Sequence, residues 1–277
     1  MLRQRVITAV LLLAVLLPAL FYPSIAPFAA FTLLLIVAAG WEWARLNGAG
    51  ARLSLALGMG LGALMAAIWL LGGLTHSWRG LWMVVGMLWV LLSVVMLARG
   101  VSGWGAWPSG LRLWLGLGLI GCAWLAMVQA RLVGLEFLLS VLLLVWVADI
   151  AAYAGGKTFG RRKLAPSISP GKSWEGAVSG FMGVFVLAAI WLWADAQGAG
   201  HATSLYARLW GFGPLLAVVS LGFMVCMSVV GDLVESLVKR SAGVKDSSGL
   251  LPGHGGVLDR VDALLPVLPL AMMLTTL

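Results

Sequence analysis

Acidic, basic and hydroxyl residues recur at helical spacing between residues 231 and 262, where the chain could bind cations and phosphate groups. They form two groups, each with the spacing of one helical face: Asp232, Glu235, Ser236 and Lys239, followed by Asp259 and Asp262. Carboxylates in such an arrangement can hold Mg²⁺, which prefers oxygen ligands and shares its coordination shell with substrate phosphates. The pattern therefore predicts a metal-assisted phosphate site.

A bend at His254-Gly255-Gly256 separates these two groups. Its glycines leave a bare backbone that can approach a ligand closely. The lone His254 gives little support to a metal ligand; a histidine that stabilises the turn or binds phosphate is the favoured interpretation. We therefore predict that the bend contacts substrate.

A second polar segment, at residues 154–176, follows an acid near the end of an apolar stretch. Asp149 is that acid, and Tyr153 shares its helical face. An ionisable residue at such a position is functional or is paired with a nearby cation. Ser169-Pro170 predicts a helix start, with serine as the N-cap. Lys172 and Ser173 would then lie in the first turn, where free amides and a positive helix end suit phosphate.

A nucleotide-binding P-loop is excluded in this second segment. Gly171-Lys172-Ser173 has the end of that motif, but the required earlier glycine is replaced by Pro166 and no strand precedes the segment. The predicted phosphate site must therefore be of another kind.

The elements that position these residues are membrane helices. Of the 277 residues, 62% are hydrophobic and 10% are charged, whereas about 25% are charged in soluble domains. Nine apolar segments are long enough to span a bilayer as helices: Val6–Phe21, Phe28–Ala44, Leu53–Leu71, Leu81–Leu97, Leu113–Ala130, Phe137–Tyr153, Ala177–Ala194, Leu209–Val230 and Ala263–Leu277. We predict an all-α, polytopic integral membrane protein with about nine transmembrane helices.

The distribution of Lys and Arg predicts the orientation. With nine spans, 15 of the 18 basic residues, Arg3 and Arg5 among them, lie on the side of the N-terminus. This excess places the N-terminus in the cytoplasm and the C-terminus outside. Residues 1–135 would form about five N-terminal spans, and residues 136–277 a catalytic region with cytoplasmic loops at 154–176 and 231–262. Cys122 and Cys226 lie in apolar segments and indicate no disulfide framework.

The acids concentrate in the same two loops. Seven of the ten acidic residues lie in or beside them, although the net charge of the chain is +8. A loop that only fixes topology needs Lys and Arg but has no use for so many carboxylates. A solvated, salt-bridged surface is the alternative explanation for part of the cluster.

At this point the residues resemble a known family. The run from Ser236 through Lys245-Asp246 and Leu251-Pro252-Gly253-His254-Gly255-Gly256 to Asp259-Arg260-Val261-Asp262 resembles, without departure over its 27 positions, the signature of the phosphatidate cytidylyltransferases. The segment Ser169-Pro170-Gly171-Lys172-Ser173 is similar to that family's other polar loop.

The resemblance implies a reaction of CTP with phosphatidate that yields CDP-diacylglycerol and pyrophosphate. It also implies Mg²⁺, a single ion or a pair, and a homodimeric enzyme that works on the cytoplasmic side, which we expect to be that of a bacterial inner membrane. By analogy, Asp232 and Asp259 would be the principal metal ligands, with Asp246 and Asp262 close by. We expect CTP, phosphatidate and the lipid bilayer as partners, and no nucleic acid.

The expected roles of the residues follow the repulsion between two polyanionic substrates. The lipid phosphate is mostly ionised at neutral pH, because its second pKa is about 6, so that no strong base is needed. Cations must neutralise charge and hold the attack in line. We assign catalysis to Asp232, Asp246, Asp259, Lys239 and Arg260; metal binding to Asp149, Asp232, Asp259 and Asp262; and substrate binding to Tyr153, Lys172, Ser173, Arg240, Lys245, His254, Gly255 and Gly256.

Two other functions use the same features. A CTP-dependent kinase of polyprenol or phytol would share the site but would phosphorylate an alcohol, which needs a base. A membrane transporter would place acids near the bilayer midplane, whereas the acids of this chain gather at one face.

Overall fold

The computed structural model describes residues 2–198 and 203–275, which are mainly α-helical. The side chains of Arg3 and Arg5, and the final two residues of the predicted span 263–277, lie outside the described part. The helices are α1 (Leu2–Phe21), α2 (Ala26–Leu46), α3 (Ala51–Leu70), α4 (Arg79–Gly105), α5 (Ser109–Val133), α6 (Leu135–Phe159), α7 (Trp174–Ala196), α8 (Leu205–Gly211), α9 (Pro214–Ser241), α10 (Leu258–Val261) and α11 (Leu264–Thr275). Strands β1 (Lys163–Ala165) and β2 (Ser169–Ser173) form a hairpin.

Within the described residues, seven helices are long and apolar enough to cross a membrane: α2, α3, α4, α5, α6, α7 and α9. Helices satisfy their backbone hydrogen bonds internally, which the hydrocarbon core of a bilayer requires. The predicted all-α, polytopic fold is therefore confirmed. The predicted first span falls on α1, whose shorter apolar part is Val6–Phe21, and the predicted last span falls on the 12-residue α11. A total of nine spans and the side of the N-terminus stay predictions.

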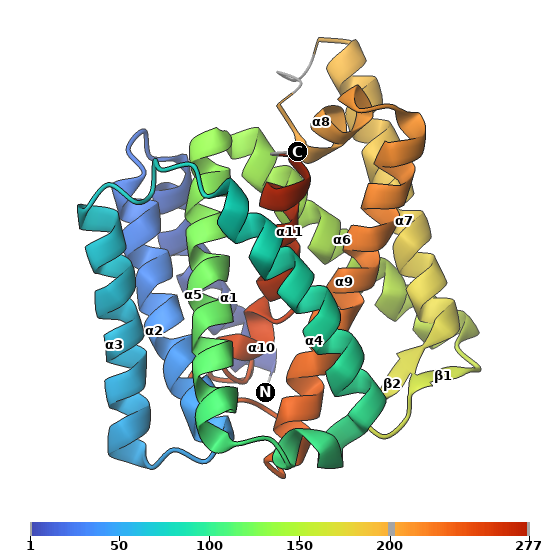
Figure 1. The fold of residues 1–277 in the computed structure, drawn as a ribbon. Helices are drawn as coiled ribbons and strands as arrows, with labels where there is room; N and C mark the ends of the chain where they lie inside the picture. Colours follow the sequence, from blue (N-terminus) through green and yellow to red (C-terminus); the bar gives the residue numbers. More distant parts are fainter. Residues whose placement is uncertain (1, 199–202, 276–277) are drawn as a thin grey trace.

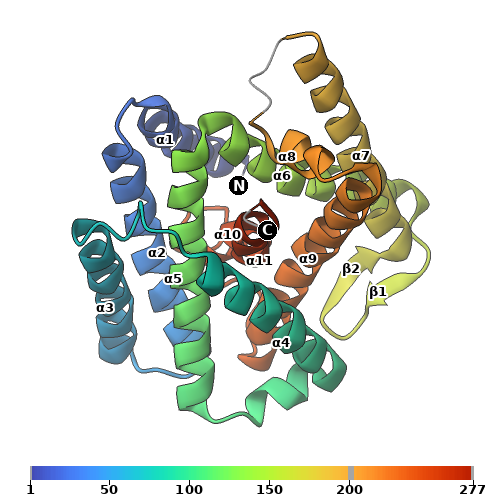
Figure 2. The same ribbon diagram turned by 45° about the horizontal axis from the view of Figure 1, so that its top comes forward.

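Helix α11 lies at the centre of the molecule. Figure 2, in which it is seen close to end-on, shows the other helices around it. It packs against α4, α5, α6, α8 and α9, and residues 264–272 are all buried. With 12 residues, α11 is about 18 Å long, shorter than the roughly 30 Å hydrocarbon core. Such a length is typical of a buried core helix.

Two groups of helices flank this centre. Figure 1 shows α1, α2, α3 and α5 on one side, α6, α7 and α9 with the hairpin on the other, and α4 crossing in front. The hairpin, α10 and the start of the chain all lie in the lower half of that view. The pairs α2–α3 and α6–α7 are the most closely packed. At Gly176 a Cβ atom would lie 2.7 Å from the Ala152 carbonyl oxygen, so this close approach of α6 and α7 requires glycine.

The predicted helix start at Ser169-Pro170 is wrong. Residues 169–173 form β2, which pairs antiparallel with β1, and α7 begins only at Trp174. Ser173 is the N-cap of α7, and its Oγ accepts a hydrogen bond from Gly176 N at 3.1 Å. Pro170 is tolerated because a two-stranded hairpin leaves one edge of each strand without ladder partners. Lys172 and Ser173 therefore precede the helix instead of lying in its first turn.

The two polar loops are shorter than predicted. Helix α6 continues to Phe159 and α9 to Ser241, so residues 154–159 and 231–241 are helical. The helical face predicted from Asp232 to Lys239 is confirmed, since Asp232 accepts a hydrogen bond from Ser236 Oγ at 3.1 Å. These extensions carry polar side chains of α6 and α9 toward the hairpin.

Candidate active site

The two polar segments meet at an ion pair. Nζ of Lys172, on β2, lies 2.7 Å from Oδ2 of Asp232, on α9. The same ammonium donates to the Val229 carbonyl oxygen at 3.4 Å. Two residues that are 60 positions apart in the chain thus share one contact, and both were predicted as site residues.

A cavity of about 440 Å³ opens beside this pair. Five of the residues that the sequence assigned to the site line this cavity: Asp149, Tyr153, Lys172, Ser173 and Asp232. Apolar groups, including Ala152, Ala177 and Val229, complete the wall, and Lys157 adds a second cation. Ligand pockets usually measure about 300–1,000 Å³ and combine apolar walls with a few polar groups. The cavity therefore has the size and composition of a ligand site.

A second, more buried cluster surrounds Lys239. Its Nζ lies 2.6 Å from Oδ1 of Asp259 and 2.5 Å from Oε2 of Glu235. The side chains are 12%, 4% and 3% exposed in that order. One ammonium thus faces two carboxyl groups. Of its three residues, Glu235 was not among the residues predicted to act.

Asp259 is held by donors on all sides. Its Oδ2 accepts hydrogen bonds from Gly256 N at 2.7 Å and from Ser247 N and Oγ, each at 2.9 Å. Burial raises the pKa of Asp259, but the hydrogen bonds from Lys239, Gly256 and Ser247 outweigh it and lower that pKa to about 2. The bare backbone predicted to approach a ligand at Gly256 contacts this carboxylate. Asp259 is therefore a fixed, permanently charged group.

Asp262 lies between the two clusters. A Cβ atom at Gly231 would come within 2.6 Å of the Asp262 carbonyl oxygen, so glycine lets α9 approach the chain here. Burial first, and then the nearby charge of Asp232, raise the pKa of Asp262 to about 7. The ammonium groups of Lys172 and Lys239 act in the opposite direction. Such a carboxyl group favours any additional cation beside it.

The remaining predicted residues do not line the cavity beside Lys172. Arg240 donates to the Ile168 and Val244 carbonyl oxygens, both at 3.4 Å, and so ties the hairpin to α9. Lys245, Asp246 and Arg260 are exposed. The backbone N of His254 closes the bend by donating to the Leu251 carbonyl oxygen at 2.8 Å. Its buried Nδ1 has no hydrogen-bond partner within the described residues.

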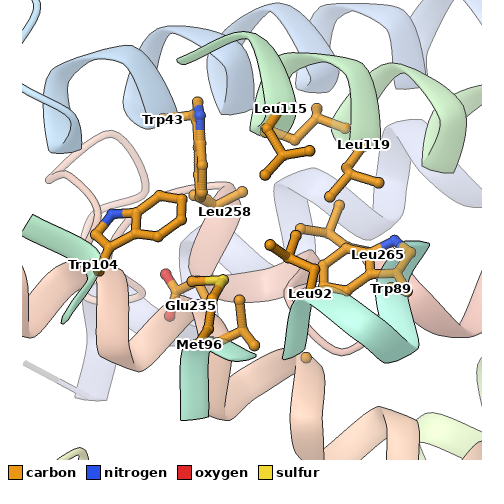
Figure 3. A pocket seen from close by; sticks show the side chains of 14 residues that line it. Trp43, Trp89, Leu92, Met96, Trp104, Leu115, Leu119, Glu235, Leu258 and Leu265 are labelled. Carbon is orange, nitrogen blue, oxygen red and sulfur yellow. The ribbon is translucent and has the colours of Figure 1, made fainter. Parts of the chain in front are cut away.

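Glu235 borders a small apolar cavity. Figure 3 shows its carboxylate near Trp104 and Met96, with Trp43 and Leu258 across the cavity. Its Oε1 has no hydrogen-bond partner in the described part of the chain. A carboxylate buried against indole rings depends on Lys239 for its charge balance, which explains the short contact between them. The helical spacing of Glu235 and Lys239 was the signal that could have identified this pair.

Glu42 is the other residue that the sequence analysis did not assign to the site. It lies on α2, is fully buried, and accepts hydrogen bonds from Val257 N at 3.0 Å and Leu258 N at 2.7 Å. An acid within an apolar segment is the signal that applied to Asp149, and it applies equally to Glu42.

A metal ion has no preformed cage in the described residues: no group of three or more His, Cys, Asp or Glu side chains is arranged to hold one. Mg²⁺ needs less, since it commonly uses one or two carboxylates with waters and substrate phosphates. Asp232 and Asp262 fit that requirement, because the charge of Asp232 lies close enough to raise the pKa of Asp262 across the approach at Gly231.

Comparison with known proteins identifies the family of the chain. The model of the cytidylyltransferase family matches residues 3–277. The chain is 39% identical to the phosphatidate cytidylyltransferase of Pseudomonas aeruginosa, over 97% of this chain and 95% of that protein. It is 34% identical to the phosphatidate cytidylyltransferase of Haemophilus influenzae, over 97% of this chain and 96% of that protein. With both polar segments joined at one cavity and its relatives matched over nearly their whole length, the chain belongs to the cytidylyltransferase family.

Proposed function

We propose that this protein transfers the cytidylyl group of CTP to phosphatidate, giving CDP-diacylglycerol and pyrophosphate. The observation that carries the proposal is the contact between Lys172 and Asp232, which joins the two polar segments beside a cavity of ligand size. The names of the relatives from P. aeruginosa and H. influenzae support the same reaction. The chain is a membrane enzyme because the diacyl tail of its substrate stays in the bilayer.

The cavity beside Lys172 would hold the reacting phosphates. It lies among α6, β2, α7 and α9, so one wall is formed by helices long enough to span the membrane. A lipid phosphate could enter from the side of the bilayer while the nucleotide enters from water. Lys172 and Lys157 supply positive charge there, and the Tyr153 ring, 71% exposed, is free to contact a ligand. Apolar groups such as Val229 suit the glycerol and acyl parts of the lipid.

The reaction forms one bond to phosphorus and breaks another. A phosphate oxygen of phosphatidate attacks the α-phosphorus of CTP, and the bond from that phosphorus to the oxygen bridging to the β-phosphorus breaks. Pyrophosphate leaves with the electron pair. The nucleophile is already ionised at neutral pH, since its second pKa is about 6, so the protein contributes position and positive charge more than a base.

In the absence of substrate, two lysines form ion pairs with carboxylates of the site. Lys172 neutralises Asp232, and Lys239 neutralises Asp259. We expect Lys172 to turn toward phosphate oxygens on binding, because its side chain is 23% exposed and lines the cavity. We also propose Mg²⁺, held by Asp232 and Asp262, with Asp149 and Asp259 as further candidate ligands; the ion would neutralise phosphate charge.

We also propose that the enzyme is a homodimer in a bacterial inner membrane. Its active site would face the cytoplasm. Bacterial relatives support that membrane, and the excess of Lys and Arg on the side of the N-terminus supports the orientation.

Product analysis tests the proposed reaction. Purified protein in detergent micelles would be given CTP, phosphatidate and MgCl₂, and the products would be separated by chromatography and mass spectrometry. CDP-diacylglycerol and pyrophosphate in equal amounts are expected. Release of CDP, together with a phosphorylated product when a polyprenol or phytol replaces phosphatidate, would identify a lipid kinase instead.

A further inference from the structure

Glu42 is the only acidic residue among residues 1–135. It lies on α2 in the apolar second segment, and its side chain is fully buried. Burying a carboxylate in an apolar environment is costly unless its oxygens are hydrogen-bonded. The hydrogen-bond donors to Glu42 therefore indicate the role of this buried carboxylate.

All four of its donors come from one short stretch of the second polar segment. Glu42 accepts hydrogen bonds from the backbone N of Val257 and Leu258, and from the hydroxyl groups of Ser247 and Ser248. A carboxylate offers about four lone-pair sites, and Val257 N, Leu258 N and Ser248 Oγ donate to three of them without a competing acceptor. More than 200 positions separate Glu42 from these donors in the chain. Glu42 is therefore a buried acceptor that anchors residues 247–258.

The same stretch holds Asp259. Ser247 N and Oγ and Gly256 N all donate to Oδ2 of Asp259. Ser247 thus touches both carboxylates. Its Oγ lies 3.2 Å from Glu42 and 2.9 Å from Asp259, so the two carboxylates share its single hydroxyl proton. A Cβ atom at Gly256 would lie 2.0 Å from Ser247 Oγ and 2.3 Å from Glu42 Oε1, so only glycine fits between them. The position of Asp259 depends on Glu42 through this chain of contacts.

We propose that Glu42 is a positioning residue for the active site: it fixes residues 247–258 and, through them, Asp259 and its partner Lys239. The N-terminal helices thereby contribute to the site, in addition to anchoring the protein. This inference rests on the proposed function, since it gives Glu42 a part in the same site. It does not place Glu42 in contact with either substrate.

The test compares Glu42→Gln with Thr32→Val in the full-length protein in detergent. Glutamine keeps the size of the side chain but turns an NH₂ group toward donors that need an acceptor. Thr32 is a matched control, because it is buried on the same helix ten residues earlier and its Oγ1 accepts a hydrogen bond from Trp124 Nε1. Thr32→Val removes that buried hydrogen bond, and none of the hydrogen bonds of Thr32 involves residues 247–258.

Hydrogen–deuterium exchange and magnesium titration give the two measurements. Glu42→Gln is expected to speed amide exchange in residues 247–258 at least about tenfold, because several hydrogen bonds that hold this stretch are weakened together. The Mg²⁺ concentration for half-maximal activity is expected to rise about 10- to 100-fold, as for other residues that orient metal ligands. Thr32→Val is expected to change neither.

Equal exchange rates in residues 247–258 for Glu42→Gln and Thr32→Val would overturn the proposal. If Glu42→Gln does not accumulate in the membrane, Ser248→Ala is the second test, because it removes one donor to Glu42 and leaves the charge of Glu42 in place. Faster amide exchange confined to residues 247–258 is expected in this variant. Exchange at the wild-type rate would overturn the proposal. Exchange is measured without substrate, so the anchoring by Glu42 is tested even if the wild-type protein makes no CDP-lipid. Failure of the proposed reaction would instead appear as the absence of CDP-diacylglycerol among the products of the wild-type protein.

Discussion

The two lysine–carboxylate pairs of the site differ in burial. The side chains of Lys172 and Asp232 are 23% and 32% exposed and border a large cavity. Those of Lys239 and Asp259 are 12% and 4% exposed and are enclosed by further hydrogen bonds. An open pair can exchange its partner for a substrate at little cost, whereas a buried pair cannot be broken without leaving a bare charge. The first pair is therefore suited to binding, and the second to fixing the geometry.

The largest effect is expected for Lys239→Met, which removes the cation shared by Glu235 and Asp259. Two carboxylates would be left buried without a counter-charge, so the protein should lose about 3–5 kcal/mol of stability and nearly all activity. Thermal unfolding in detergent, followed by circular dichroism, measures the first effect. Lys172→Met is the matched control, and an equal loss of stability in both variants would remove the distinction between the pairs.

Asp232→Asn should abolish turnover while leaving the protein folded. The change preserves size but removes the charge that would bind Mg²⁺, so kcat should fall at least about 100-fold. Since the Lys172–Asp232 pair is partly exposed, stability should change by less than about 1 kcal/mol. Turnover of CTP and the unfolding temperature check both parts. Near-normal turnover would show that Asp232 does not take part in the reaction.

A smaller effect is expected for Lys172→Met on substrate binding. Loss of one charge-assisted hydrogen bond to phosphate costs about 1.5–3 kcal/mol, which corresponds to a rise in KM of about 10- to 100-fold. Initial rates at varied CTP and phosphatidate would show which substrate the lysine contacts. Unchanged kcat and KM for both substrates would place Lys172 outside the reaction.

The last prediction concerns the dependence of stability on pH. The pKa of Asp262 is about 7 in the folded chain, above the ordinary value of about 3.9 for an unfolded aspartate. The folded state therefore holds a proton that the unfolded state has lost, and stability should fall as pH rises from about 4 to about 7. Unfolding temperatures at pH 5, 6, 7 and 8, without Mg²⁺, measure this slope. Asp262→Asn should flatten it, and an equal slope in that variant would assign the effect to another group.

The sequence predicted the helical fold, and it assigned residues of both polar segments to one site. Long apolar segments have few folded alternatives in a bilayer, and the spacing of Asp232, Ser236 and Lys239 identified a helical face. The start of α7 was mispredicted because Ser169-Pro170 satisfies local helix rules, whereas pairing with Lys163–Ala165 draws the residues into a strand. A hairpin contact of this kind is not visible in a local pattern.

The role of Glu42 shows what sequence spacing could not reveal. Its partners lie more than 200 residues away, so no short-range pattern connects them. An unexplained acid in an apolar segment was nevertheless visible. The short length of α11 could likewise be measured on the sequence, but its place at the centre of the bundle follows only from packing.

The most direct measurement follows each phosphorus atom of CTP through the reaction. CTP labelled with ³²P at the α- or the γ-position would be incubated with the purified protein, phosphatidate and Mg²⁺, and lipid would be separated from water-soluble products. The α-label is expected in the lipid fraction and the γ-label in pyrophosphate, with both transfers lost in Asp232→Asn. A γ-label in the lipid fraction, or no label in lipid from either nucleotide, would contradict cytidylyl transfer at this site.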